Sequence, residues 1–212
     1  MGKSLSSYCE PGPKLDPGLC PLLSWVMGPI LETARLVLRP MRRDDAPRIQ
    51  EVFPNIEVTR YLASAIPWPY PDNGAEEFLS FALPEMEEGK RYLWALTEKG
   101  GSDELIGLIE LSLVGEFNRG FWLIPEHHRK GFMTEAVAAV NDFAFETVGM
   151  EKLRLGNAEP NVGSHKLKAK SGAILVEHYD DVPYIGGTFR EEVWELTADQ
   201  WRRNRIRFLS GQ

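Results

Sequence analysis

Residues 120–136 read GFWLIPEHHRKGFMTEA, and the order of the elements in this stretch carries most of the structural information in the chain. The apolar segment 121–124 has the character of a short strand, and Pro125 ends it. A basic loop that contains one glycine follows. From Thr134 onward, apolar residues recur at helical spacing, which predicts a long amphipathic helix with Thr134 at its N-cap. The sequence therefore predicts that a strand, a loop and a helix N-terminus follow one another directly.

The loop before this helix has the chemistry of an anion-binding site. A helix N-terminus presents unpaired backbone N–H groups and the positive end of the helix dipole. Arg129 and Lys130 add formal charge there, and Gly131 allows a ligand to approach the backbone closely. The usual nucleotide loops, Gly-x-x-x-x-Gly-Lys-Ser/Thr and Gly-x-Gly-x-x-Gly, do not occur in the sequence. The loop therefore predicts a phosphate or pyrophosphate site of another kind.

Outward from this stretch, strand and helix patterns are interspersed. Apolar or alternating runs predict strands over 34–40, 92–96, 105–114, 153–157, 174–179 and 191–196. The last two of these are expected to pair antiparallel. We expect a mixed α/β sheet in one domain, residues 29–212.

Helix signals lie between these strands. Helices are predicted from Asp44 as N-cap, from Asn73 with Glu76 in a capping box, over 164–170, and after a Thr197–Gln200 capping box. In the second of these helices, the expected buried stripe consists of Phe78, Phe81 and Ala82.

Composition and charge limit the possible functions. The 212 residues are 43% hydrophobic and 26% charged, which is ordinary for a globular protein. A formal net charge of −7 disfavours nucleic acid as a partner, and no apolar run reaches the ~20 residues that cross a membrane. Cys9 and Cys20 form neither a disulfide framework nor a metal site, so we expect a cytoplasmic protein. Residues 1–28 are predicted to be an irregular extension, or alternatively an arm that covers a neighbouring subunit in a homodimer.

Four motifs in the correct order resemble the GNAT superfamily, specifically its Rim-type branch of ribosomal-protein N-terminal acetyltransferases. The segment Arg129 to Ala136 is similar to the acetyl-CoA-binding loop and helix of that branch. The other similar segments are 32–40 with 44–46, then 68–70, and finally 161–164 with 169–172. Together they span roughly residues 30–203. The sequence departs from the family pattern at Arg129, which replaces a glycine, and at Ala169 and Ala173.

The resemblance implies a single-domain GNAT fold, α/β (α+β), with a mixed, mostly antiparallel central sheet flanked by helices. It implies transfer of an acetyl group from acetyl-CoA to a primary amine, on a protein N-terminus or a small molecule, through a tetrahedral intermediate. The three departures leave one alternative open, a catalytically silent acyl-CoA-binding module. An enzyme that uses another acyl-CoA, such as succinyl-CoA, is a second alternative. A phosphate-binding protein unrelated to CoA is a third.

The resemblance also assigns roles to residues. The expected cofactor-binding residues are Leu123, Ile124, His128, Arg129, Lys130, Gly131, Phe132, Met133, Thr134, Asn161, Ser164 and Lys170. A backbone N–H near Leu123 or Ile124 would donate to the oxyanion, and Trp68 and Tyr70 would line the acceptor pocket. Ser164 would protonate the CoA thiolate, or is simply a serine that starts a helix. Asn161 would bond the pantetheine arm or is itself the helix cap.

The residues leave the catalytic base open. Glu177 matches a family glutamate proposed to act through water, but an exposed strand glutamate is the alternative. Glu110 is a competing base if it faces the cleft, where desolvation would raise its pKa. Lys166, Lys168 and Lys170 contact the 3′-phosphate of CoA or form a solvated helix face. Adjacent histidines on an extended segment point to opposite sides, so no catalytic metal is expected.

Overall fold

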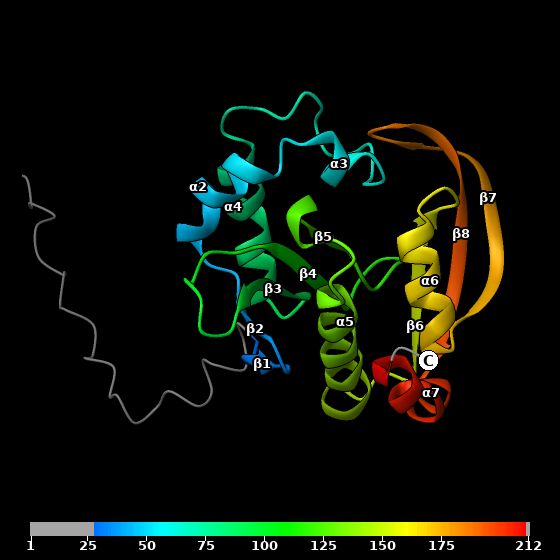
Figure 1. Cartoon of the computed structure of the whole chain (residues 1–212). Coiled ribbons are helices and arrows are strands. Elements are labelled where there is room, and N and C mark those ends of the chain that lie inside the picture. Colours follow the sequence, from blue (N-terminus) through cyan, green and yellow to red (C-terminus); the bar gives the residue numbers. More distant parts are fainter. Residues whose placement is uncertain (1–27, 211–212) are drawn as a thin grey trace, which may run out of the picture.

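The computed structural model describes residues 28–210, so all of the predicted extension except Gly28 lies outside the described residues. Two antiparallel sheets form its centre (Figure 1). The first sheet has the order β1-β2-β3-β4-β5. Its strands are β1 (Leu31–Glu32), β2 (Leu36–Pro40), β3 (Arg91–Glu98), β4 (Gly107–Ser112) and β5 (Phe121–Leu123). The predicted strands of this half are therefore confirmed, with β4 shorter than the predicted 105–114.

The second sheet has the order β6-β8-β7, with β6 (Lys152–Ala158), β7 (Ile174–Tyr184) and β8 (Gly187–Thr197). The predicted antiparallel pairing of the last two strands is confirmed, and both strands are longer than expected. Hydrogen bonds join the two sheets just before the start of β5. There, Asn118 N donates to Arg154 O over 2.9 Å, and Arg154 N donates to the Asn118 side chain over 2.7 Å. Beyond this contact β5 and β6 belong to different sheets.

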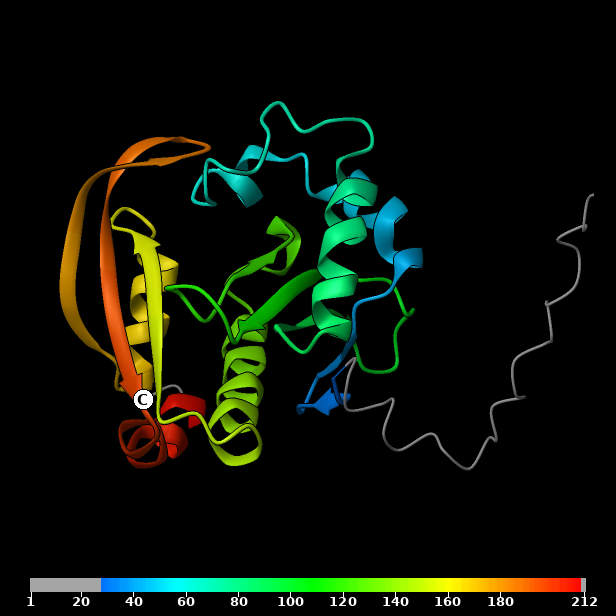
Figure 2. The ribbon, with the colours of Figure 1, turned by 180° about the vertical axis from the view of Figure 1, so that it is seen from behind.

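The helices pack in two groups around α5. They are α2 (Ala46–Val52), α3 (Ile56–Thr59), α4 (Gly74–Glu87), α5 (Phe132–Asp142), α6 (Val162–Ser171) and α7 (Ala198–Ser210). In Figure 2, α2 and α4 lie beside the first sheet, α6 and α7 beside the second, and α5 lies between the groups. A π-helical turn, Phe143–Thr147, extends α5. A cluster of buried apolar residues includes members of both sheets and of α5.

Local sequence patterns correctly indicated most of the helix ends, but not all of them. Thr197 and Gln200 make the predicted reciprocal capping bonds before α7, with N–O distances of 2.7 and 3.2 Å. The predicted N-cap at Thr134 is wrong, because α5 begins at Phe132 and Gly131 occupies the cap with φ 83°. Asp45 rather than Asp44 precedes α2.

In α4, the prediction of the start was right and that of the buried face was partly wrong. Asn73 is at the N-cap but forms no capping bond; its side-chain amide donates to Glu77 instead. Phe81 is 53% exposed, whereas Leu79 and Met86 are fully buried. The buried face of α4 is therefore rotated about the helix axis, from the predicted stripe toward Leu79.

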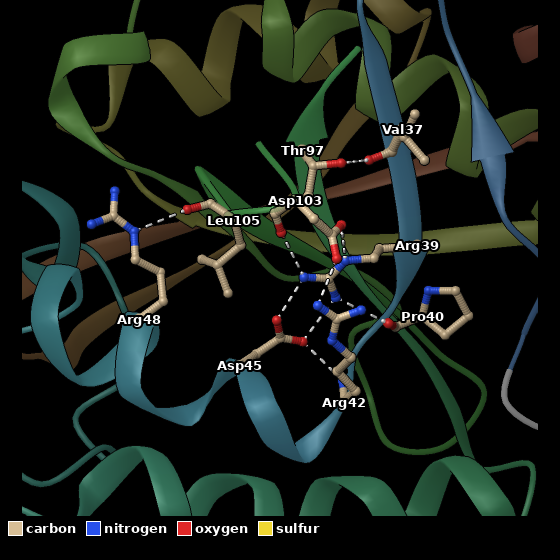
Figure 3. Close-up of polar contacts among 9 residues, drawn as sticks. All are labelled: Val37, Arg39, Pro40, Arg42, Asp45, Arg48, Thr97, Asp103 and Leu105. Carbon is tan, nitrogen blue, oxygen red and sulfur yellow. Dashed lines mark hydrogen bonds and ion pairs between the residues drawn. The ribbon is translucent and has the colours of Figure 1, made fainter. Parts of the chain in front are cut away.

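A buried ion-pair cluster fixes β2 against the turn before α2 (Figure 3). The Arg39 guanidinium donates to both carboxylate oxygens of buried Asp45 over 2.9 and 2.6 Å. Its Nε donates to Asp103 over 2.7 Å, and Arg42 also pairs with Asp103 over 2.6 Å. The Asp45 carboxylate also accepts the backbone N–H of Arg42. One buried guanidinium thus connects β2, the first helical turn and the loop after β3.

Candidate active site

A cleft of about 580 Å³ opens between β5 and the start of α6. One wall is β5 and the loop and helix start that follow it. The opposite wall is the N-terminal turn of α6, and a third side is formed by α3 and the residues after it. The lining residues are Glu57, Val58, Arg60, Tyr61, Leu62, Phe121, Trp122, Leu123, His127, His128, Arg129, Gly131, Phe132, Met133, Thr134, Asn161, Gly163, Ser164 and Leu167.

The loop before α5 has the left-handed backbone conformation at two positions. Gly131 has φ 83° and Arg129 has φ 59°. A non-glycine residue in this region is strained by roughly 1–3 kcal/mol. Arg129 therefore keeps a backbone conformation suited to glycine while it adds a charged side chain to the cleft.

An ionic clamp that sequence analysis missed holds this loop from outside the cleft. Arg35 donates from Nη2 to the Lys130 carbonyl over 2.8 Å and pairs through Nε with Glu135 over 2.5 Å. Its guanidinium also lies 4.5 Å from the centre of the Phe132 ring. Thr33 donates to the same Glu135 over 2.6 Å. These contacts connect the start of β2 to the first turn of α5, across about a hundred residues of chain.

The clamp affects the charge state of its carboxylate. Burial disfavours the ionised form of Glu135, but hydrogen bonds from Thr33 and Arg35 outweigh burial, so the pKa of Glu135 is lowered. A negative charge in the first turn of a helix also interacts favourably with the helix dipole. Glu135 therefore stabilises the N-terminus of α5 without facing the cleft.

The end of β5 offers one backbone donor to the cleft. Ile124 N donates to Ile106 O over 3.0 Å, so its N–H is already used. In an antiparallel ladder, successive N–H groups alternate between the two edges of a strand. The N–H of Leu123 therefore points away from β4, toward the cleft. Its carbonyl lies 2.7 Å from Nε2 of His128, which fixes the loop against the strand end.

The first turn of α6 forms the opposite wall. The Asn161 side chain accepts the backbone N–H of Ser164 over 3.1 Å, so Asn161 acts as the helix cap. Ser164 is 6% exposed and lines the cleft. Its hydroxyl oxygen accepts a hydrogen bond from Nζ of Lys168 over 2.6 Å. Lys168, expected on a solvated or phosphate-binding face, is therefore a buried residue.

The third side of the cleft, where Trp68 and Tyr70 were expected, is formed by residues that sequence analysis did not single out. Trp68 and Tyr70 do not line it. Tyr70 instead packs against Phe53 and beneath Gly74, and burial, followed by the charge of Glu77, raises the pKa of its hydroxyl to about 12. In their place, α3 and residues 60–62 contribute one acidic, one basic, one aromatic and two aliphatic side chains: Glu57, Arg60, Tyr61, Val58 and Leu62.

The tip of the β7–β8 hairpin supports this third side. Gly186 N donates to Arg60 O over 2.9 Å, and Ile185 N donates to Leu62 O over 3.1 Å. A Cβ on Gly186 would lie 2.7 Å from the Arg60 carbonyl oxygen, so only glycine permits this approach. The hairpin thus positions the residues that line this third side.

The two predicted bases lie outside the cleft lining. Glu177, on β7, accepts from Arg154 over 2.7 Å, and hydrogen bonds from Arg154 and then Tyr179 lower its pKa. Burial raises the pKa of Glu110 on β4, although its ion pair with Arg91 over 3.1 Å opposes this. Their placement weighs against both as a direct base.

Most of the predicted cofactor residues are brought together. Nine line the cleft: Leu123, His128, Arg129, Gly131, Phe132, Met133, Thr134, Asn161 and Ser164. Ile124, Lys130 and Lys170 do not line it. Within residues 28–210, no group of three or more His, Cys, Asp or Glu side chains gathers as a metal site. No helix in that part of the chain is long and apolar enough to cross a membrane.

Comparison with known proteins identifies relatives of this arrangement. Residues 35–174 match the family model described as the acetyltransferase (GNAT) domain. The uncharacterised N-acetyltransferase YoaA of Bacillus subtilis is 33% identical over 157 residues, which cover 69% of this chain and 83% of that protein.

Solved structures share the fold. RimJ of Mycobacterium smegmatis, in complex with CoA-disulfide, superposes with a TM-score of 0.71 at 16% identity, covering 83% of this chain and 88% of RimJ. The ribosomal-protein-S5-alanine acetyltransferase of Vibrio fischeri superposes with a TM-score of 0.69 at 18% identity, covering 82% and 99%.

Proposed function

The chain belongs to the GNAT acetyltransferase family, and we propose that it transfers the acetyl group of acetyl-CoA to a primary amine. One observation carries the proposal. The cleft is lined both by Arg129 and residues 131–134, at the start of α5, and by Ser164. A pyrophosphate at the first position and a thioester at the second would suit the two ends of one CoA molecule.

The residues present fit this ligand. The left-handed backbone at Arg129 and Gly131 precedes α5, whose first N–H groups have no partner within the helix. The unpaired edge of β5 next to the cleft can receive an extended amide-containing arm, as a strand edge receives a peptide. The N–H of Leu123 lies on that edge and would donate to the thioester oxygen as it gains charge.

The chemistry requires little from a base. An α-amino group has a pKa of about 7.7–8.0, so a substantial fraction is neutral near pH 7. The neutral nitrogen attacks the thioester carbonyl, and the tetrahedral oxyanion accepts from Leu123 N–H. When the intermediate collapses, the C–S bond breaks with its electron pair on sulfur, and Ser164 donates its hydroxyl proton to the thiolate. The acceptor nitrogen releases its extra proton to solvent, and the serine oxygen is then reprotonated.

Calorimetric titration with acetyl-CoA, with ATP and dephospho-CoA as controls, tests the cofactor. We expect micromolar binding of acetyl-CoA, weaker binding without the 3′-phosphate and none of ATP. Release of free thiol in the presence of an amine then tests turnover. Binding without thiol release would establish the silent module instead, and release from succinyl-CoA alone would establish a longer acyl donor.

We further propose that the acceptor is a protein N-terminus, as in the Rim-type branch. Two structural neighbours are named as ribosomal-protein acetyltransferases acting on serine and alanine. Thiol release from acetyl-CoA should therefore be faster with peptides that begin with serine or alanine than with a polyamine at equal concentration. A faster reaction with the polyamine would assign a small-molecule acceptor.

A further inference from the structure

Behind the cleft wall, α6 carries a buried amine that the proposed mechanism does not yet use. Lys168 follows Ser164 by one helical turn and is only 2% exposed. Its Nζ donates to the Ser164 hydroxyl over 2.6 Å. Ser164 lines the cleft and Lys168 does not, so the lysine can reach a cleft ligand only through the serine.

Charged groups outside α6 influence the charge state of this amine. Buried Arg119, which precedes β5, disfavours the ammonium form, while Glu192 and Glu191 of β8 favour it. The Glu192 carboxylate is already occupied by hydrogen bonds from Asn157 and His165, both over 2.9 Å. Burial is the largest effect, followed by Arg119, and the pKa of Lys168 lies well below its ordinary value.

We propose that Lys168 supplies the proton that Ser164 delivers to the departing CoA thiolate. This inference rests on the proposed acetyl transfer. As the C–S bond breaks, its electron pair stays on sulfur and the sulfur takes the Ser164 hydroxyl proton. The serine oxygen takes a proton from the Lys168 ammonium. The acceptor nitrogen forms the C–N bond and loses one proton to solvent, and solvent later returns one to Lys168, so the step balances.

A lysine suits this role only in such surroundings. An ordinary lysine ammonium has a pKa of about 10.4 and a thiol about 8.5, so proton transfer between them is unfavourable by about two pKa units. Burial and Arg119 reduce this difference. A serine hydroxyl alone would become a strongly basic alkoxide after donation, and the adjacent ammonium prevents this. Lys168 is therefore a positioning residue that acts through Ser164.

Thiol release by four proteins tests the relay: wild type, Lys168→Met, Ser164→Ala and the double variant. We expect Lys168→Met to lower kcat at least about tenfold, with KM for acetyl-CoA within twofold. The double variant should be no slower than Ser164→Ala. Wild-type kcat should fall as pH rises through the Lys168 pKa, and this fall should vanish in both single variants. Lys152→Met, which removes an exposed lysine of β6, serves as the matched control.

Equal kcat in Lys168→Met and wild type, or a double variant slower than Ser164→Ala, would overturn the proposal. A binding measurement tests the relay even if Lys168→Met fails to fold or if no turnover is detected. Ultraviolet absorbance of the thiolate gives the pKa of the CoA thiol bound to each protein. The ammonium should hold that pKa lower in wild type than in Lys168→Met or Ser164→Ala, and equal values in wild type and Ser164→Ala would refute the relay. Absence of wild-type turnover with any amine would refute only the proposed acetyl transfer.

Discussion

Replacing Arg129 with glycine should raise stability and lower CoA affinity at the same time. Arg129 has φ 59°, where a non-glycine side chain costs roughly 1–2 kcal/mol. Glycine relieves this strain but loses about 0.5–1 kcal/mol more backbone entropy on folding. The net expected gain is about 0.5–1 kcal/mol. For a chain of this length, each kcal/mol shifts the midpoint of thermal unfolding by about 2–4 °C, so Arg129→Gly should unfold about 1–4 °C higher.

The affinity for acetyl-CoA should change in the opposite direction from the stability, and fall. Arg129 lines the cleft at the start of α5, and a charge-assisted hydrogen bond contributes about 1.5–3 kcal/mol. Because the side chain is exposed, we expect the lower limit, about 1.5 kcal/mol, which corresponds to a roughly tenfold weaker Kd for acetyl-CoA. Thermal unfolding without ligand and calorimetric titration measure the two effects separately.

Arg129→Ala is the matched control, because alanine removes the charge and keeps the strain. It should lose the same affinity as Arg129→Gly and gain no stability. Tighter binding in either variant would show that Arg129 blocks the phosphate, and a less stable Arg129→Gly would refute the strain argument.

Four further substitutions test residues that lie outside the cleft lining. Asp45→Asn removes the buried partner of Arg39; breaking such a pair costs about 3–5 kcal/mol, but Asp103 remains, so we expect about 2–3 kcal/mol in urea unfolding. Asp103→Asn, at the exposed end, should cost less than about 1 kcal/mol, and equal losses would contradict the burial argument. Gly186→Ala places a Cβ 2.7 Å from a carbonyl oxygen, so the amides of the hairpin tip should exchange hydrogen faster, and unchanged exchange would show that the contact is not needed. The contacts that lower the pKa of Glu135 contribute stability that is present above its ordinary pKa of 4.5 and is lost as pH falls through the lowered value. Below that pH, the free energies of unfolding of wild type and Glu135→Gln should therefore converge. A difference that stays constant with pH would exclude the ion pair as its cause.

The sequence predicted the parts of the structure that local patterns control. Strands β2, β3, β6 and β8 have apolar or alternating runs, and the capping box at Thr197 marks the start of α7. The loop at residues 129–131 was identified because a helix start, a glycine and two charges lie together in the chain.

Other parts depended on contacts that local patterns do not contain. Helix α3 has only four residues, too few for a periodic pattern, so the side of the cleft that it forms was not predicted. Arg35 contacts Glu135 a hundred residues away and looks like any polar strand residue. Lys168 resembles a surface lysine in the sequence, but only 2% of it is exposed in the folded chain. Tyr70 has the motif of a cleft residue but is held elsewhere by its packing against Phe53.

Residues 60–62 contact the tip of the β7–β8 hairpin, and this seam links one wall of the cleft to the second sheet. Two backbone hydrogen bonds close this seam, and each contributes about 0.5–1.5 kcal/mol net. Opening it would also separate the rings of Tyr61 and Phe189, whose centroids lie 5.7 Å apart, so the total cost exceeds that of the two hydrogen bonds alone. Residues 60–62 and the hairpin tip are therefore expected to move together, and a shift of the hairpin would reshape this wall of the cleft.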